Sequence, residues 1–128
     1  MRSLIAAVCL AITCGTASSA LAATLRGTWV GSGYFKPGSG PSERVRCRVT
    51  YSPRTRRVIG VVARCASASG TLRQTGELLK IRENRYVGDF YNAQFNVRGR
   101  VRVTISGRRQ TVVFVGDGGA GRLRLRRR

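Results

Sequence analysis

The chain offers few side chains that could do acid–base or nucleophilic chemistry. It contains no histidine, and its five acidic residues, Glu43, Glu77, Glu83, Asp89 and Asp117, are scattered without close pairing in sequence. General acid–base catalysis usually relies on histidine or on paired carboxylates, and a serine or cysteine nucleophile needs a neighbouring base. The sequence therefore argues against an enzyme and predicts no catalytic residue.

Two cysteines, Cys47 and Cys65, carry the main covalent signal. An even pair predicts a disulfide if the protein matures in an oxidising compartment. Such a bridge closes a loop of about 19 residues and contributes roughly 3 kcal/mol in the chain-entropy model. The alternative is two free, buried thiols. No metal site is expected, because two thiolates without histidine do not supply four ligands, and nothing indicates a cofactor.

Residues 1–22 have the pattern of a cleavable secretory signal peptide. Arg2 precedes an apolar run over residues 4–12, and small residues ending in Ala20, Leu21 and Ala22 follow. A short basic region, an apolar region and an A-x-A site define such a signal. The apolar run is too short for a bilayer, which needs roughly 20 residues, although an N-terminal anchor or buried helix is the alternative. We expect a single mature domain, residues 23–128, that is periplasmic or secreted.

The mature chain alternates between apolar and polar residues with a period of two. Val45, Cys47, Val49 and Tyr51 share one face, and arginines occupy most of the other. This pattern is typical of antiparallel strands with one buried and one solvated face. Segments rich in Gly, Pro, Asn and Ser separate the runs. The expected strands are 25–35, 43–51, 56–65, 69–82, 85–91, 94–106, 110–116 and 120–127.

Short connections between eight strands predict that neighbours in sequence pair in space. Such a meander folds into a sandwich or closes into a barrel, and closure removes the exposed edges. We therefore expect an all-β, eight-stranded antiparallel up-and-down barrel. The second face of three strands carries arginine, which excludes the apolar outer band of an outer-membrane barrel.

The expected hairpin and the expected disulfide disagree in register. A tight turn centred near Arg54 would place Cys47 opposite Val61 rather than Cys65. Four residues of strand span about 13 Å, more than the Cα separation that a disulfide tolerates. A longer loop, a bulge, or an earlier end of the strand 56–65 that leaves Cys65 outside it would restore the bridge.

The first mature strand carries a G-x-W motif, Gly27-Thr28-Trp29. On the opening strand of an eight-stranded meander, this motif resembles the calycin-like barrels: lipocalins, avidins and bacterial metalloprotease inhibitors. The resemblance implies that Trp29 closes the base of the barrel, with Arg122 or Arg124 of the last strand packed across it. The first two mature strands are also similar to those of small exported proteins of proteobacteria, a group that implies no activity.

The strongly basic charge favours anionic partners. The net charge is +19 at pH 7, and removal of residues 1–22 leaves it almost unchanged. A net charge of this size indicates which partners a protein attracts, and it does not indicate the fold. Outward arginine rows on two expected strands predict a face for lipopolysaccharide or another anionic polymer: Arg44, Arg46, Arg48, Arg98, Arg100 and Arg102. The alternative is an arginine-rich surface that is merely solvated.

Aromatic residues next to the longest loop predict a ligand rim at one end of the barrel. Tyr34, Phe35 and Lys36 lead into this loop, and Tyr91 lies in a later hairpin. Aromatic rings beside basic groups can stack on a ligand and hold its anionic groups; the alternative is packing of these rings in the interior.

The favoured function is a non-enzymatic exported module that binds an unknown small ligand or an envelope partner. One alternative is a polyanion-binding envelope protein. The other is an inhibitor of an exported protease, which the resemblance to metalloprotease inhibitors implies. In that case, residues 23–26 would act as an extended inserting segment.

Overall fold

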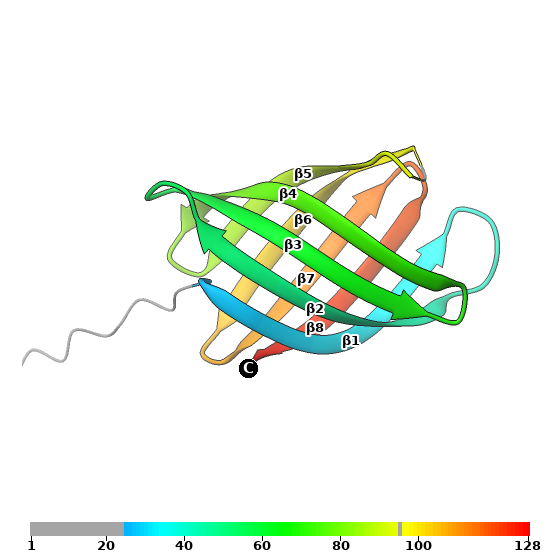
Figure 1. Cartoon of the computed structure of the whole chain (residues 1–128), viewed down its shortest axis with the longest axis horizontal. Coiled ribbons are helices and arrows are strands. Elements are labelled where there is room, and N and C mark those ends of the chain that lie inside the picture. Colours follow the sequence, from blue (N-terminus) through cyan, green and yellow to red (C-terminus); the bar gives the residue numbers. More distant parts are fainter. Residues whose placement is uncertain (1–24, 95) are drawn as a thin grey trace, which may run out of the picture.

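The computed structural model describes residues 25–94 and 96–128, so the predicted signal peptide lies outside the described residues. In this part of the chain, eight strands form a closed antiparallel barrel (Figure 1). Each strand pairs with its neighbour in sequence, and the last pairs with the first, so the predicted fold class is confirmed. The strands are β1 (Gly27–Pro37), β2 (Glu43–Pro53), β3 (Val58–Ser67), β4 (Gly70–Arg82), β5 (Arg85–Asn92), β6 (Val97–Ser106), β7 (Arg109–Gly116) and β8 (Gly119–Arg127).

The period-two pattern decides which side chains face the interior. On β2, Cys47, Val49 and Tyr51 are buried, whereas the alternating Arg46 and Arg48 are exposed. The same alternation holds on β8, where Leu123 and Leu125 are buried and Arg122, Arg124 and Arg126 are exposed. No helix able to cross a membrane occurs within the described ranges.

The barrel has two unlike ends. Loops 54–57, 83–84 and 107–108 lie at one end, together with residues 25–26 and the C-terminus; we call it the base end (left in Figure 1). Loops 38–42, 68–69 and 117–118 lie at the other, together with residues 93, 94 and 96; we call it the rim end. The core is concentrated toward the base end, where the largest fully buried side chains are those of Leu25, Trp29, Leu78 and Val103.

The β2–β3 hairpin differs from the tight turn that the sequence suggested. Thr50 pairs with Val62, so the loop spans residues 54–57 and is centred two residues later than expected. The side chain of Thr55 explains the longer loop, because its Oγ1 accepts hydrogen bonds from the backbone N–H groups of Arg57 and Val58 at 3.3 and 3.0 Å. A threonine hydroxyl that bonds to nearby backbone in this way stabilises a turn.

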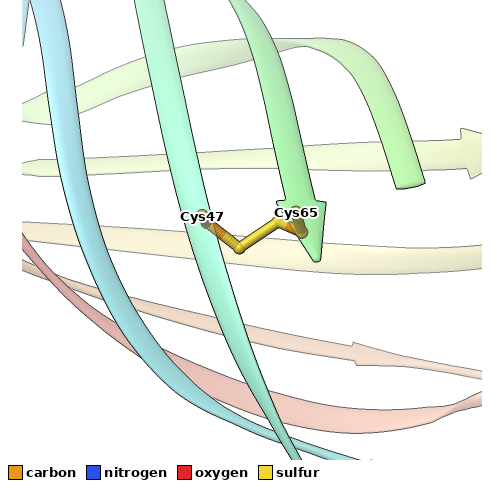
Figure 2. The surroundings of a disulfide bond; sticks show 2 residues. All are labelled: Cys47 and Cys65. Atoms are coloured by element: carbon orange, nitrogen blue, oxygen red, sulfur yellow. A yellow bond between two sulfur atoms is a disulfide. The ribbon is translucent and has the colours of Figure 1, made fainter. Parts of the chain in front are cut away.

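With this loop, Cys47 faces Cys65 directly and the two form a disulfide (Figure 2). Their Cα atoms are 4.1 Å apart. The bridge therefore needs no bulge and no early end of β3, and the predicted pairing is confirmed. A disulfide within one chain is typical of proteins from non-reducing compartments.

The start of β6 is a second difference. The strand was expected from residue 94 but begins at Val97. Asn96 precedes it with a φ of 51°, a left-handed conformation that asparagine tolerates better than most residues and that interrupts an extended strand. The other strand ends lie within two residues of their expected positions.

Removing the disulfide should destabilise the barrel without opening it. We expect the double variant Cys47→Ala/Cys65→Ala to lose about 2–4 kcal/mol of unfolding free energy, because the unfolded chain regains the entropy of an uncrosslinked loop. Urea unfolding followed by circular dichroism measures this loss. Reduction of the wild-type protein should lower the midpoint by a similar amount. Equal stability of the oxidised wild type and the double variant would show that the bridge does not contribute.

Candidate binding cavity

The rim half of the interior is not filled by side chains. Several inward positions there are glycines, among them Gly76, Gly99 and Gly116. A cavity of about 480 Å³ lies in this half of the interior, with Gly76 in its lining, and it reaches the rim-end loops at Ser69 and Gly118. The space beside Gly99 is taken by the ring of Phe90. Valine dominates its wall, at positions 45, 49, 61, 97, 101, 103 and 112.

Three phenylalanines also line the cavity. Phe35 and Phe114 stack with their ring centroids 6.0 Å apart and their planes at 20°. The ring of Phe114 lies against Gly121, where an added Cβ would come within 2.1 Å of it. Glycine at this inward position therefore makes room for the ring, a use of glycine that is common in barrels. Phe90 on β5 is the third ring.

Tyr51 lines the inner end of the cavity, toward the base, and is tied to Gln110. Its hydroxyl donates a hydrogen bond of 2.6 Å to Gln110 Oε1. Burial raises the pKa of the Tyr51 hydroxyl far above its ordinary value, because the phenolate would be poorly solvated. The Nε2 atom of Gln110 is buried without a hydrogen-bond partner in the described part of the chain.

Two hydrogen-bonded polar pairs lie in the cavity wall, Ser69 with Glu43 and Asn92 with Gln74. Asn92 Nδ2 donates to Gln74 Oε1 at 2.9 Å, and Gln74 Nε2 donates to the carbonyl oxygens of Tyr91 and Thr75, both at 2.8 Å. The polar atoms of Gln74 are thus satisfied within the protein, as buried polar groups require. The wall offers a ligand mainly apolar and aromatic surface.

Of the four predicted rim residues, Phe35 alone lines the cavity. Tyr34 is 59% exposed and Lys36 is also exposed, because even-numbered positions of β1 point outward. Tyr91 is 47% exposed and lies under the guanidinium of Arg98, 4.8 Å from the ring centroid. These three side chains therefore lie outside the cavity, an outcome that the alternation of faces predicts and that position in the chain does not.

The base end is sealed by Trp29, which is 0% exposed and donates from Nε1 to the Leu25 carbonyl at 3.0 Å. The arginine that packs on this ring is Arg127, with its guanidinium carbon 4.7 Å from the ring centroid. The expectation of Arg122 or Arg124 was wrong, because both are exposed on the outer face of β8. Residue 127 shares the inward parity of Leu123 and Leu125, a signal that the sequence did contain.

The segment proposed for protease insertion is partly used by the barrel itself. Leu25 is buried beneath Trp29, and the Arg26 carbonyl accepts a hydrogen bond of 2.6 Å from Arg127 Nη1. Leu25 would have to leave the core to insert into a protease. Residues 23 and 24 lie outside the described residues.

The two predicted arginine rows do not form one face. Arg44, Arg46 and Arg48 are exposed on β2, and Arg98, Arg100 and Arg102 are exposed on β6. Strands β7, β8 and β1 lie between these rows on one side of the barrel, and β3, β4 and β5 on the other. The β6 row is also partly neutralised, because Arg100 Nε lies 3.5 Å from Asp89 Oδ1.

Within the described ranges, no three His, Cys, Asp or Glu side chains come together as a metal site would need. Three of the carboxylates form exposed ion pairs, with Arg54, Lys80 and Arg100. The fold and the cavity together define a closed eight-stranded barrel whose interior could accommodate a small molecule.

Comparison with known proteins finds similarity only to solved structures, and this similarity concerns the fold. No protein-family model and no curated protein matches it. Among solved structures, a redesigned β-barrel is 18% identical over 84% of this chain and 94% of that chain, with a TM-score of 0.67. Another redesigned barrel, mFAP1 bound to DFHBI, is also 18% identical, over 83% of this chain and 97% of that chain, with a TM-score of 0.69. A de novo designed fluorescence-activating β-barrel is 22% identical over 80% and 93% of the two chains, with a TM-score of 0.61.

These neighbours are designed barrels and not calycins. They share the architecture of this chain, and at such low identity the likeness concerns the fold alone. Membership in the calycins stays a prediction that rests on the G-x-W motif.

The raised pKa of Tyr51 predicts a loss of stability in alkali. Above pH 10 the unfolded chain releases the Tyr51 proton while the folded barrel retains it, so ionisation favours unfolding. We expect this residue to lower the unfolding free energy by about 1.4 kcal/mol per pH unit above pH 10. Urea unfolding at pH 9 to 11 should show a shallower pH dependence for Tyr51→Phe. If the unfolding free energy of the wild type and of Tyr51→Phe fell equally with pH, Tyr51 would not be the source of the alkaline instability.

The contribution of the Arg127–Trp29 contact to stability can be measured by comparison with Arg124, an exposed arginine on the same strand. We expect Arg127→Ala to lower the unfolding free energy by about 1–2 kcal/mol, since it removes a cation–π contact and a hydrogen bond. Arg124→Ala removes the same charge from the exposed face of β8 and should change stability by less than about 0.5 kcal/mol. If chemical unfolding gives equal losses, Arg127 has no special role in the base.

Proposed function

We propose that the protein is a non-enzymatic, exported binding module that holds one small, uncharged ligand inside the barrel. The cavity of about 480 Å³ carries this proposal. Its size falls in the range of about 300–1,000 Å³ that is typical of small-molecule sites. Its wall combines four aromatic rings, those of Phe35, Tyr51, Phe90 and Phe114, with many aliphatic side chains, which is also typical of such sites.

The lining indicates the chemical class of the ligand. None of the described residues that line the cavity is arginine or lysine, although these residues cover much of the outer surface. An anionic group inside would therefore lose its hydration without gaining a cationic partner. An apolar molecule with at least one aromatic ring fits the contacts that Phe35, Phe90 and Phe114 offer.

Three further observations support the proposal. Two barrels of the same architecture are bound to DFHBI, so this fold is compatible with small-ligand binding. The signal-peptide pattern of residues 1–22 and the disulfide both fit an exported protein. The absence of histidine and the pairing of carboxylates with basic side chains favour binding over catalysis.

The test uses an uncharged fluorescent probe, N-phenyl-1-naphthylamine, which the basic surface does not attract. We expect saturable binding of one probe per barrel, with little change between 0.05 and 0.5 M NaCl. Ala63→Phe should abolish this binding, because Ala63 lines the cavity and the added ring occupies it.

The neighbouring residue provides a matched control. Val62 points outward on β3, so Val62→Phe adds a ring to the same strand without filling the cavity. It should bind the probe like the wild type, and circular dichroism should show that both variants are folded. Equal binding by wild type, Val62→Phe and Ala63→Phe would refute an interior site. If the interior site is confirmed, native mass spectrometry of the protein purified from the periplasm should identify a bound natural ligand.

A further inference from the structure

The outer face of β1 is a line of uncharged residues between two rows of arginine. Val30, Ser32 and Tyr34 point outward on β1, and each has an exposed arginine beside it on both β2 and β8. Arg44 and Arg122 flank Tyr34, Arg46 and Arg124 flank Ser32, and Arg48 and Arg126 flank Val30. We call these three residues and their six arginines the β1 trough.

Strand geometry sets the dimensions of the β1 trough. The two arginine rows stand two strand spacings apart, about 10 Å, and successive arginines in a row are about 7 Å apart. The outer surface here is part of a hollow of about 1270 Å³, which extends beyond the β1 trough to Arg64, Arg73 and Arg109. The hollow does not include Tyr34, Arg44 and Arg122 at the rim end of the β1 trough. Its lining includes Val30, Ser32, Arg46, Arg48, Arg124 and Arg126.

The arginines of the β1 trough are not neutralised within the described chain. All five carboxylates have partners elsewhere: Glu77 with Arg54, Glu83 with Lys80, Asp89 with Arg100, Asp117 with the backbone N–H of Arg98, and Glu43 with the hydroxyl of Ser69. Like charges held at this spacing repel one another. An anion that binds between the rows relieves this repulsion.

We propose that the β1 trough binds one chain of an acidic polysaccharide, whose carboxylate or sulfate groups pair with the two arginine rows. Arginine suits this task, because its planar fork donates two parallel hydrogen bonds to one such group. The rigid ladder of β2, β1 and β8 fixes the rows before the polymer arrives. This site lies outside the cavity and does not depend on the proposed interior ligand.

The floor of the β1 trough favours a polysaccharide over other polyanions. A single-stranded nucleic acid is usually held by several aromatic rings that stack on its bases, and the floor offers one ring, Tyr34, at its rim end. An anionic membrane is a broad surface and would meet the projecting arginine side chains rather than the hollow between them. A single chain can lie along the hollow and reach both rows.

The experiment measures heparin binding by isothermal titration calorimetry from 0.05 to 0.5 M NaCl. Two triple variants remove the same charge: Arg46→Gln/Arg48→Gln/Arg124→Gln in the β1 trough, and Arg98→Gln/Arg100→Gln/Arg102→Gln on β6. We expect the trough variant to bind about tenfold more weakly or worse, with a slope of log K against log salt that is reduced by about 2. The β6 variant should stay close to the wild type. All positions are exposed, and circular dichroism checks that both variants are folded.

Several results would overturn the proposal. Equal weakening by the two triple variants would mean that heparin responds to net charge alone, and wild-type binding unchanged by 0.5 M NaCl would exclude an ionic site. Oligothymidylate that binds more tightly than a heparin fragment of equal charge would make the occupant a nucleic acid. Complete displacement of heparin by vesicles with 30% phosphatidylglycerol would show that the β1 trough binds an anionic membrane instead. Ala63→Phe should bind heparin like the wild type, because the change lies in the cavity. The heparin experiment therefore tests the β1 trough even if the cavity proposal fails.

Discussion

Close approach between β1 and β8 is the constraint on which the barrel depends. A Cβ added at Gly31 would lie 2.0 Å from the Arg124 carbonyl oxygen, and one added at Gly33 would lie 1.8 Å from that of Arg122. Any side chain at these positions would push the last strand away from the first. The two strands would then each have an unpaired edge, which proteins avoid because such edges recruit other chains.

Closure explains why the two ends of the interior can differ. Once the ladder is complete, the hydrogen bonds between strands hold the wall in place at every level. The base end fills its interior with Leu25, Trp29 and Leu78, while the rim end combines three phenylalanines with glycine and valine at inward positions. Large side chains supply the buried apolar area that stabilises the fold, and small ones leave the space that a ligand needs.

The fold could be predicted from the sequence because its signal is repeated on every strand. Alternation places valine and leucine inward and arginine outward, and the turn residues mark the strand ends, so strand number and order followed. The length of the β2–β3 loop could not be predicted, since it depends on which backbone groups the Thr55 hydroxyl meets in space.

The site was harder to predict than the fold, because it depends on contacts between residues that are distant in sequence. Phe35 and Phe114 line one cavity from strands that are far apart in sequence, and only the closed ring brings them together. The alternation nevertheless held more information than was first taken from it. Parity alone assigns Arg127 to the interior side of β8 and Tyr34 to the outer side of β1.

The separation of charge from the interior also resolves how so basic a chain can fold. Self-repulsion weakens a compact state most when like charges are buried or crowded in a low dielectric. Here the arginine rows project from the outer wall into water, where salt screens them, and the residues that line the cavity include no arginine or lysine. On β1 the two faces of a single strand show the division most clearly. Its inward glycines permit closure, and its outward Val30 and Ser32 leave the space between two rows of charge. The net charge of +19 therefore acts on what the protein binds rather than on whether it folds.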